Sequence, residues 1–251
     1  MLVSHRYQFI FIKTVKTAGT SIESYFEPYC MFEGEWEQSH ARDEYISEAG
    51  IIGQRAQRYR KKGMRKRMRK PTYKSHIPAY EIRKQVGEEI WNSYFKFTAV
   101  RNPFDKLVSK FLFKEMKKNK HYGRVHLMKI KMKNMLKGKE GLFDTGSEDT
   151  EIERFRQWLQ DGTRPLDRNK YILDGQICVD YFIRFECLHD DIKQICDYLS
   201  IPFEPERLPE FKKGHRDDKT PVKEFYDRET ENIVRELYDW EIRRFGYDIP
   251  V

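Results

Sequence analysis

Residues 7–13, YQFIFIK, are an apolar run of aromatic and β-branched residues that breaks into KTVKTAGTS at residues 13–21. Such a run is typical of a buried strand, and Gly19 or Thr20 is suited to begin a helix that reaches Phe26. A strand, a tight loop and a helix N-terminus together form an anion site, because backbone N–H groups and the helix dipole face the loop. The predicted anion-binding residues are Lys16, Thr17, Ala18, Gly19, Thr20 and Ser21.

The rest of the chain alternates between strand and helix patterns. Further strands are predicted at 94–100 (YFKFTAV) and 179–186 (VDYFIRFE). Helices are expected over 79–90, 103–117, 151–160, 188–199 and 227–245. This alternation favours a parallel sheet with helices on both faces. The sequence therefore predicts an α/β fold, and its 251 residues suit a single domain over 1–251.

The positive charge of the chain is concentrated in two segments. The formal net charge is +8, and residues 55–70 hold ten Lys and Arg with no acid, while residues 114–139 hold ten against one acid, Glu115. We interpret them as basic insertions around 51–74 and 114–150. Three readings stay open: solvated faces, steering of an anionic cofactor and an acidic glycan, or nucleic-acid binding. No nucleic acid is expected as a partner, because no recognised reading motif is present.

The cysteines and the hydropathy of the chain indicate the cellular compartment in which the protein is expected. The four cysteines show neither a CxxC pair nor metal-ligand spacing, so reduced thiols and no metal are expected. No run reaches the ~18 apolar residues of a membrane span, and the start MLVSHRYQFIF is too short and polar for a signal peptide. A cytoplasmic protein is expected, or a Golgi-lumenal one if the chain was trimmed from a membrane-anchored parent. The sequence carries no sign of the oligomeric state.

The order of the residues argues against an ATP-binding P-loop. That motif places its lysine after the second glycine, whereas Lys16 precedes Gly19. The stretch FIKTVKTAGTSIE instead resembles the 5′-phosphosulfate-binding loop of sulfotransferases that use 3′-phosphoadenosine 5′-phosphosulfate (PAPS). It is closest to the carbohydrate and bacterial branch, whose loop reads Pro-Lys-Thr-Gly/Ala-Gly-Thr-Ser. Val15 replaces the usual proline, a change that could loosen the loop. The resemblance implies PAPS as the cofactor, PAP as its product, and a catalytic role for Lys16.

Two further stretches resemble the same family. KFTAVRNPFDKLVSKF at 96–111 is similar to its 3′-phosphate motif, which implies that Arg101 and Ser109 bind that phosphate. A guanidinium at a strand end is suited to grip a phosphate through two N–H groups. VDYFIRFECL at 179–188 is similar to the junction that places an aromatic, here Phe185, near the adenine. Residues 212–247 resemble the family's C-terminal segment, whose implied cofactor contacts here are Lys213, His215 and Arg216.

The acceptor hydroxyl needs a proton acceptor, and a histidine or a carboxylate is suited to that role. His76 lies in YKSHIPAYEIRK, before the helix that leads to the second strand. In related glycan sulfotransferases a histidine, or in some members a glutamate, before that helix is the base, so the resemblance implies this role for His76. Glu23 and His40 are the other candidates. The expected substrate-binding residues are Lys13, Glu23 and His40.

The resemblance implies a three-layer P-loop-like fold with a central parallel sheet flanked by helices. It also implies transfer of a sulfuryl group from PAPS to a hydroxyl of a carbohydrate acceptor, for which an acidic glycan would suit the basic segments. The alternative is a non-catalytic nucleotide- or polyanion-binding protein on the same fold. A P-loop kinase is the third hypothesis for the function, and it is disfavoured because Lys16 precedes Gly19 and does not follow a second glycine.

Overall fold

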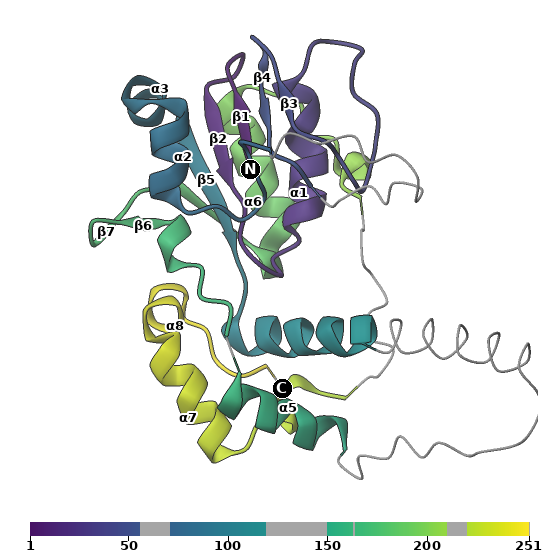
Figure 1. Cartoon of the computed structure of the whole chain (residues 1–251), viewed down its shortest axis with the longest axis vertical. Coiled ribbons are helices and arrows are strands. Elements are labelled where there is room, and N and C mark those ends of the chain that lie inside the picture. Colours follow the sequence, from purple (N-terminus) through teal and green to yellow (C-terminus); the bar gives the residue numbers. More distant parts are fainter. Residues whose placement is uncertain (56–70, 119–149, 163, 210–219, 251) are drawn as a thin grey trace, which may run out of the picture. The chain divides into compact units, whose positions relative to one another are not determined.

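A computed structural model describes residues 1–55, 71–118, 150–162, 164–209 and 220–250. The chain divides into two compact units (Figure 1). The first comprises Met1–Arg101 with Pro165–Phe211, and the second Asn102–Arg164 with Lys212–Val251. Each unit has its own hydrophobic core. The single domain expected over 1–251 stays a prediction.

A six-stranded mixed sheet forms the centre of the first unit, in the order β3-β4-β1-β2-β5-β8. The strands are β1 (Leu2–Ser4), β2 (Phe9–Ile12), β3 (Tyr45–Ile46), β4 (Gly50–Ile52), β5 (Phe95–Val100) and β8 (Tyr181–Arg184). The prediction of parallel strands is confirmed for β2, β5 and β8. It is wrong for β1, β3 and β4, which join by antiparallel pairing. These three have only two or three residues each, so they lack the 4–8-residue pattern of a recognisable strand.

Helices cover the sheet of the first unit. α1 (Gly19–Phe26) and α6 (Leu188–Leu199) share a buried cluster with Phe9, Phe11 and Phe97. Side chains alternate along a strand, so Ile10 and Ile12, which are also fully buried, point to the opposite face. α2 (Ala79–Val86) and α3 (Glu88–Ser93) lie on the other side of the sheet from α1 (Figure 1). They replace the single helix predicted over 79–90.

That predicted helix is interrupted at Gly87, which has a φ of 87°. This is a backbone conformation that glycine adopts without steric cost.

Short elements complete the first unit: η1 (Glu27–Cys30), η2 (Arg168–Lys170), the hairpin of β6 (Ile172–Leu173) with β7 (Gln176–Ile177), η3 (Phe185–Cys187) and η4 (Pro205–Arg207).

The second unit is helical. Residues 103–118 are helical, and α5 (Glu151–Asp161), η5 (Val222–Phe225), α7 (Arg228–Leu237) and α8 (Asp239–Phe245) follow. Phe104, Phe111 and Phe155 are among the buried residues that form its core. The single helix predicted over 227–245 is broken at Tyr238, whose backbone leaves the helical region and whose side chain is buried in that core.

The predicted basic insertions lie largely outside the described residues, which omit 56–70 and 119–149. At the edge of the first, Ile51 and Ile52 belong to strand β4. Among the described helices, none is both long and apolar enough to cross a membrane.

Candidate functional site

The loop after β2 places the first group of predicted site residues. Lys16 and Ala18 have positive φ values of 63° and 56°, which turn the chain tightly into α1. The Ala18 carbonyl accepts hydrogen bonds from the N–H groups of Ser21 and Ile22, at 2.8 and 3.1 Å. Gly19 begins α1, so the helix N-terminus and its partial positive charge face this loop. The predicted strand, loop and helix start are therefore confirmed as local structure.

Hydroxyl groups fix this loop to the neighbouring strand. The Thr14 and Thr17 hydroxyls are 2.8 Å apart, and the Thr14 hydroxyl also donates to the Ala99 carbonyl of β5 at 2.5 Å. Both threonine side chains are buried. Thr17, predicted as an anion ligand, thus also serves to anchor the loop on the sheet.

Lys13 explains why glycine occupies position 19. The Lys13 side chain is buried, and its ammonium donates to the Thr20 hydroxyl at 3.3 Å and to the Glu23 carboxylate at 2.5 Å. A Cβ atom on Gly19 would lie only 2.9 Å from the Lys13 Cγ atom. The absence of a side chain at Gly19 lets the lysine stem run against the start of α1.

We expect Gly19→Ala to lower the free energy of unfolding by about 1–3 kcal/mol, the usual cost of overpacking. Lys13 cannot easily move away, because its ammonium is held by Glu23. Chemical denaturation of wild type and variant measures the effect. The control is the same change in a Lys13→Ala background, where the clash is absent and the cost should shrink. An equal cost in both backgrounds would contradict this explanation.

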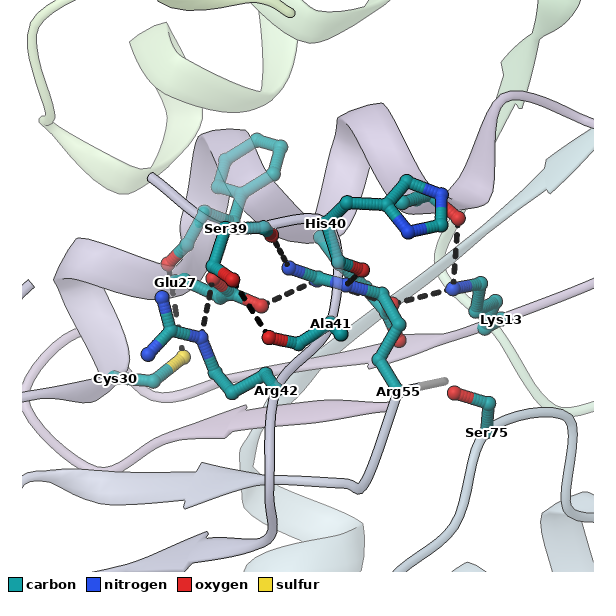
Figure 2. A network of polar contacts seen from close by, with 12 residues as sticks. Lys13, Glu27, Cys30, Ser39, His40, Ala41, Arg42, Arg55 and Ser75 are labelled. Atoms are coloured by element: carbon teal, nitrogen blue, oxygen red, sulfur yellow. Dashed lines mark hydrogen bonds and ion pairs between the residues drawn. The ribbon is translucent and has the colours of Figure 1, made fainter. Parts of the chain in front are cut away.

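A buried network of alternating charges extends from Lys13 along α1 (Figure 2). The Glu23 carboxylate pairs with Lys13 at 2.5 Å, with the Met1 amine at 2.8 Å and with Arg55 at 3.4 Å. Arg55 also pairs with Glu27, which in turn holds Arg42 at 2.9 Å. The network therefore ties α1 and the residue after it to segments that lie 10 to 32 residues away in the sequence.

The network sets the protonation of its members. Burial alone would raise the pKa of Glu23, but Lys13, the Met1 amine and Arg55 outweigh it and hold that pKa well below its usual value. Burial lowers the pKa of Lys13, and Glu23 counteracts this in part. Glu23 is thus a buried counter-ion, and as the alternative base it fits poorly, because a strongly acidic carboxylate is a weak proton acceptor.

His76 lies in the turn before α2, with a φ of 63°. Its side chain keeps a solvent-accessible surface, yet desolvation by the surrounding atoms and repulsion from Lys13 lower its pKa to about 4. Glu23 and Asp167 act in the opposite direction. His76 is therefore in the electrostatic neighbourhood of Lys13 and is neutral at pH 7, as a proton acceptor must be.

Arg101 and Phe185 come together beside the loop. Arg101 directly follows β5, and its guanidinium lies 4.0 Å from the centroid of the Phe185 ring. It also donates a hydrogen bond to the Lys16 carbonyl at 3.0 Å. Phe185 directly follows β8. The Lys16 loop, Arg101 and Phe185 thus gather at the carboxyl ends of three adjacent parallel strands, where open α/β sheets bind their ligands.

The remaining predicted site residues are not brought into this cluster by the described structure. Ser109 is half-buried on the helix of residues 103–118 in the second unit, so its pairing with Arg101 stays a prediction. His40 is exposed, and its carbonyl accepts from Arg55 Nε at 3.0 Å (Figure 2). Lys213, His215 and Arg216 lie outside the described residues.

Two functional residues were missed from the sequence. Asp167 is buried, and its carboxylate accepts from the Val15 N–H at 3.0 Å; no motif marks it, and it lies 152 positions from its partner. Arg55 was counted as the first residue of a basic run, yet only 3% of it is exposed. The signal in the sequence that could have indicated its burial is the apolar stretch just before it, GIIG at 50–53.

No group of three metal-ligating side chains occurs among the described residues.

Comparison with known proteins agrees with this geometry. The model of the sulfotransferase family matches residues 1–248. Neither the curated proteins nor the solved structures gave a match. The match extends over nearly the whole chain, and the chain therefore belongs to the sulfotransferase family.

Proposed function

We propose that this protein transfers the sulfuryl group of PAPS to a hydroxyl of a carbohydrate acceptor, on a three-layer P-loop-like fold. The observation that carries the proposal is the convergence of the Lys16 loop, Arg101 and Phe185 at the carboxyl ends of β2, β5 and β8. The likeness of the loop to the carbohydrate branch of the family supports the acceptor class.

The donor set of the first unit fits an adenine nucleotide with several anionic groups. A helix N-terminus with a lysine and hydroxyl groups suits the 5′-phosphosulfate. Arg101 offers a planar fork of N–H donors to the 3′-phosphate, and Phe185 offers an aromatic face to the adenine. In the described structure the Arg101 guanidinium lies 4.0 Å from the centroid of the Phe185 ring, so the two side chains are adjacent at one end of the site.

The residues divide the chemistry between them. PAPS supplies the sulfuryl group, whose S–O bond to the 5′-phosphate breaks while a new S–O bond to the acceptor oxygen forms. Lys16 stabilises the negative charge that develops on the phosphate oxygen. His76, neutral at pH 7, takes the proton of the acceptor hydroxyl. Lys13, fixed by Glu23 and Thr20, adds positive potential near the transferred sulfonate.

The proposed base predicts an unusual pH profile. A base works only when it is unprotonated, so kcat/KM should fall as the pH drops through the pKa of His76, which is about 4. An unperturbed histidine would place this fall at about 6.5. We expect kcat/KM for the acceptor, measured at saturating PAPS, to be level between about pH 5.5 and 8. A fall centred near 6.5 that disappears in His76→Asn would contradict the lowered pKa.

Arg101→Ala should weaken binding of adenosine 3′,5′-bisphosphate by about 10–100-fold, the loss of a charge-assisted hydrogen-bond pair. Affinity for adenosine 5′-phosphosulfate, which lacks the 3′-phosphate, should change far less. Isothermal titration with both ligands measures the difference. Arg101→Lys is the matched control, since it keeps the charge but loses the planar fork. Equal losses for the two ligands would place Arg101 elsewhere in the site.

The proposal as a whole is tested by calorimetric and thermal-shift titration with adenosine 3′,5′-bisphosphate, with ATP and 5′-AMP as controls. Tight binding that requires the 3′-phosphate is expected, with a stabilisation of about 2.7 kcal/mol at a ligand concentration of about 100 Kd. Transfer of labelled sulfate from PAPS to a panel of glycans then identifies the acceptor. No binding, or equal binding of ATP, would favour the non-catalytic polyanion-binding alternative.

A further inference from the structure

Asp167 contacts the anion-binding loop from a distant part of the sequence. Its side chain is 2% exposed, and one carboxylate oxygen accepts a hydrogen bond from the Val15 N–H at 3.0 Å. The other oxygen pairs with Lys170 at 2.9 Å, and Lys170 is itself buried. A buried carboxylate with two such partners has one orientation. The Val15 end of the loop is therefore held by a fixed acceptor.

This contact depends on the residue type at position 15. A proline has no backbone N–H, so a chain with proline there could not make this hydrogen bond and would restrict the loop through its ring instead. Valine leaves φ free to vary but supplies the N–H that Asp167 binds. The loop in this chain is thus restrained by a side chain 152 positions away, and not by its own covalent structure.

Asp167 also reaches the segment that carries His76. It immediately precedes η2 (Arg168–Lys170), which packs against α2, and α2 begins three residues after His76. The charge of Asp167 acts on His76 as well. One buried carboxylate therefore connects the loop that bears Lys16 to the side of the site that bears His76.

We propose that Asp167 is a positioning residue that fixes the loop after β2 through the Val15 N–H, and thereby holds this loop in place relative to the segment that carries His76. The restraint is a property of the protein without ligand. Its effect on nucleotide binding rests on the proposed function. Misplacement of a catalytic loop by about 1 Å is enough to cost about 100-fold in rate, so the restraint has consequences for turnover.

The test compares three variants by hydrogen exchange of the loop amides, without ligand, and by titration with adenosine 3′,5′-bisphosphate. Asp167→Ala should speed exchange of the Val15 amide and weaken binding by about 10–100-fold, as expected for a hydrogen bond to a charged group. Asp167→Asn keeps an acceptor oxygen and should restore both readouts to near wild type. Lys170→Met removes the ion pair but keeps the acceptor of the Val15 hydrogen bond, and should speed exchange of the Val15 amide less than Asp167→Ala does.

Val15→Pro separates the restraint from other effects of Asp167, and Lys170→Met still tests the restraint if Asp167→Ala does not fold. In the Val15→Pro background, Asp167→Ala should cause little further loss of affinity, because the donor is already gone. Equal losses in both backgrounds, or unchanged Val15 exchange in Asp167→Ala, would overturn the proposal. Failure of the wild type to bind the bisphosphate would instead refute the proposed function, while the exchange result would still decide whether Asp167 restrains the loop.

Discussion

Lys16→Ala should reduce the rate of sulfuryl transfer by about 10²–10³-fold, the usual loss when one preorganised group that stabilises developing charge is removed. The reason is the position of Lys16 in the tight turn between β2 and α1, where the helix N-terminus adds its own positive potential. The fold should survive, because alanine and lysine bear similar costs at the φ of 63° found there.

Single-turnover kinetics with PAPS, together with thermal unfolding, measures the two effects separately. Lys84→Ala is the matched control, since Lys84 is an exposed lysine on α2, and it should leave the rate unchanged. A Lys16→Ala variant with the wild-type rate would refute the catalytic role of Lys16. A variant that loses its rate only in proportion to lost nucleotide affinity would make Lys16 a binding residue.

Glu23→Gln should lower the free energy of unfolding by about 3–5 kcal/mol, the cost of removing one partner from a buried ion pair. Glutamine would leave the Lys13 ammonium and the Met1 amine in the protein interior without their counter-charge. Arg55 would keep Glu27 as a partner, so the loss falls mainly on Lys13. For a chain of this size, such a change lowers Tm by roughly 6–20 °C.

The pH dependence identifies the cause. The folded pKa of Glu23 is depressed below its unfolded value of 4.5. Its contribution to stability is therefore complete above pH 4.5 and is lost as the pH falls from there through the folded pKa. The difference between wild type and Glu23→Gln, measured by urea denaturation, should be constant from about pH 6 to 8 and shrink below pH 4.5. Glu33→Gln, at an exposed position, is the control and should show no comparable loss.

The elements that present the anion site could be predicted from the sequence, because their signals are local. The apolar run of β2, the break at KTAGTS and the amphipathic start of α1 all fall within 20 residues. The strands β5 and β8 are likewise rich in aromatic and β-branched residues. Parallel strands joined through helices place their carboxyl ends at one edge of the sheet. The proximity of Lys16, Arg101 and Phe185 follows from that rule.

Short antiparallel strands could not be predicted in this way. β1 and β4 have three residues each, and they pair with each other although they are distant in the sequence. The same pairing region brings Arg55 opposite Arg42, where the two residues exchange backbone hydrogen bonds of 2.8 Å. In the sequence Arg55 is the first residue of a basic run, and only the tertiary structure shows it buried against Glu23 and Glu27.

By itself, the sequence determined the loop between β2 and α1, the three parallel strands and the residue types that meet at their ends, because a strand or a helix start depends on neighbouring residues. Tertiary structure alone decided the partners of the buried charges, including the pairing of Lys13 with Glu23 and of Asp167 with the Val15 N–H. The physical reason is that burial of a charge costs free energy unless an opposite charge or a hydrogen-bond donor is adjacent, and the folded chain can recruit that partner from any distance along the sequence.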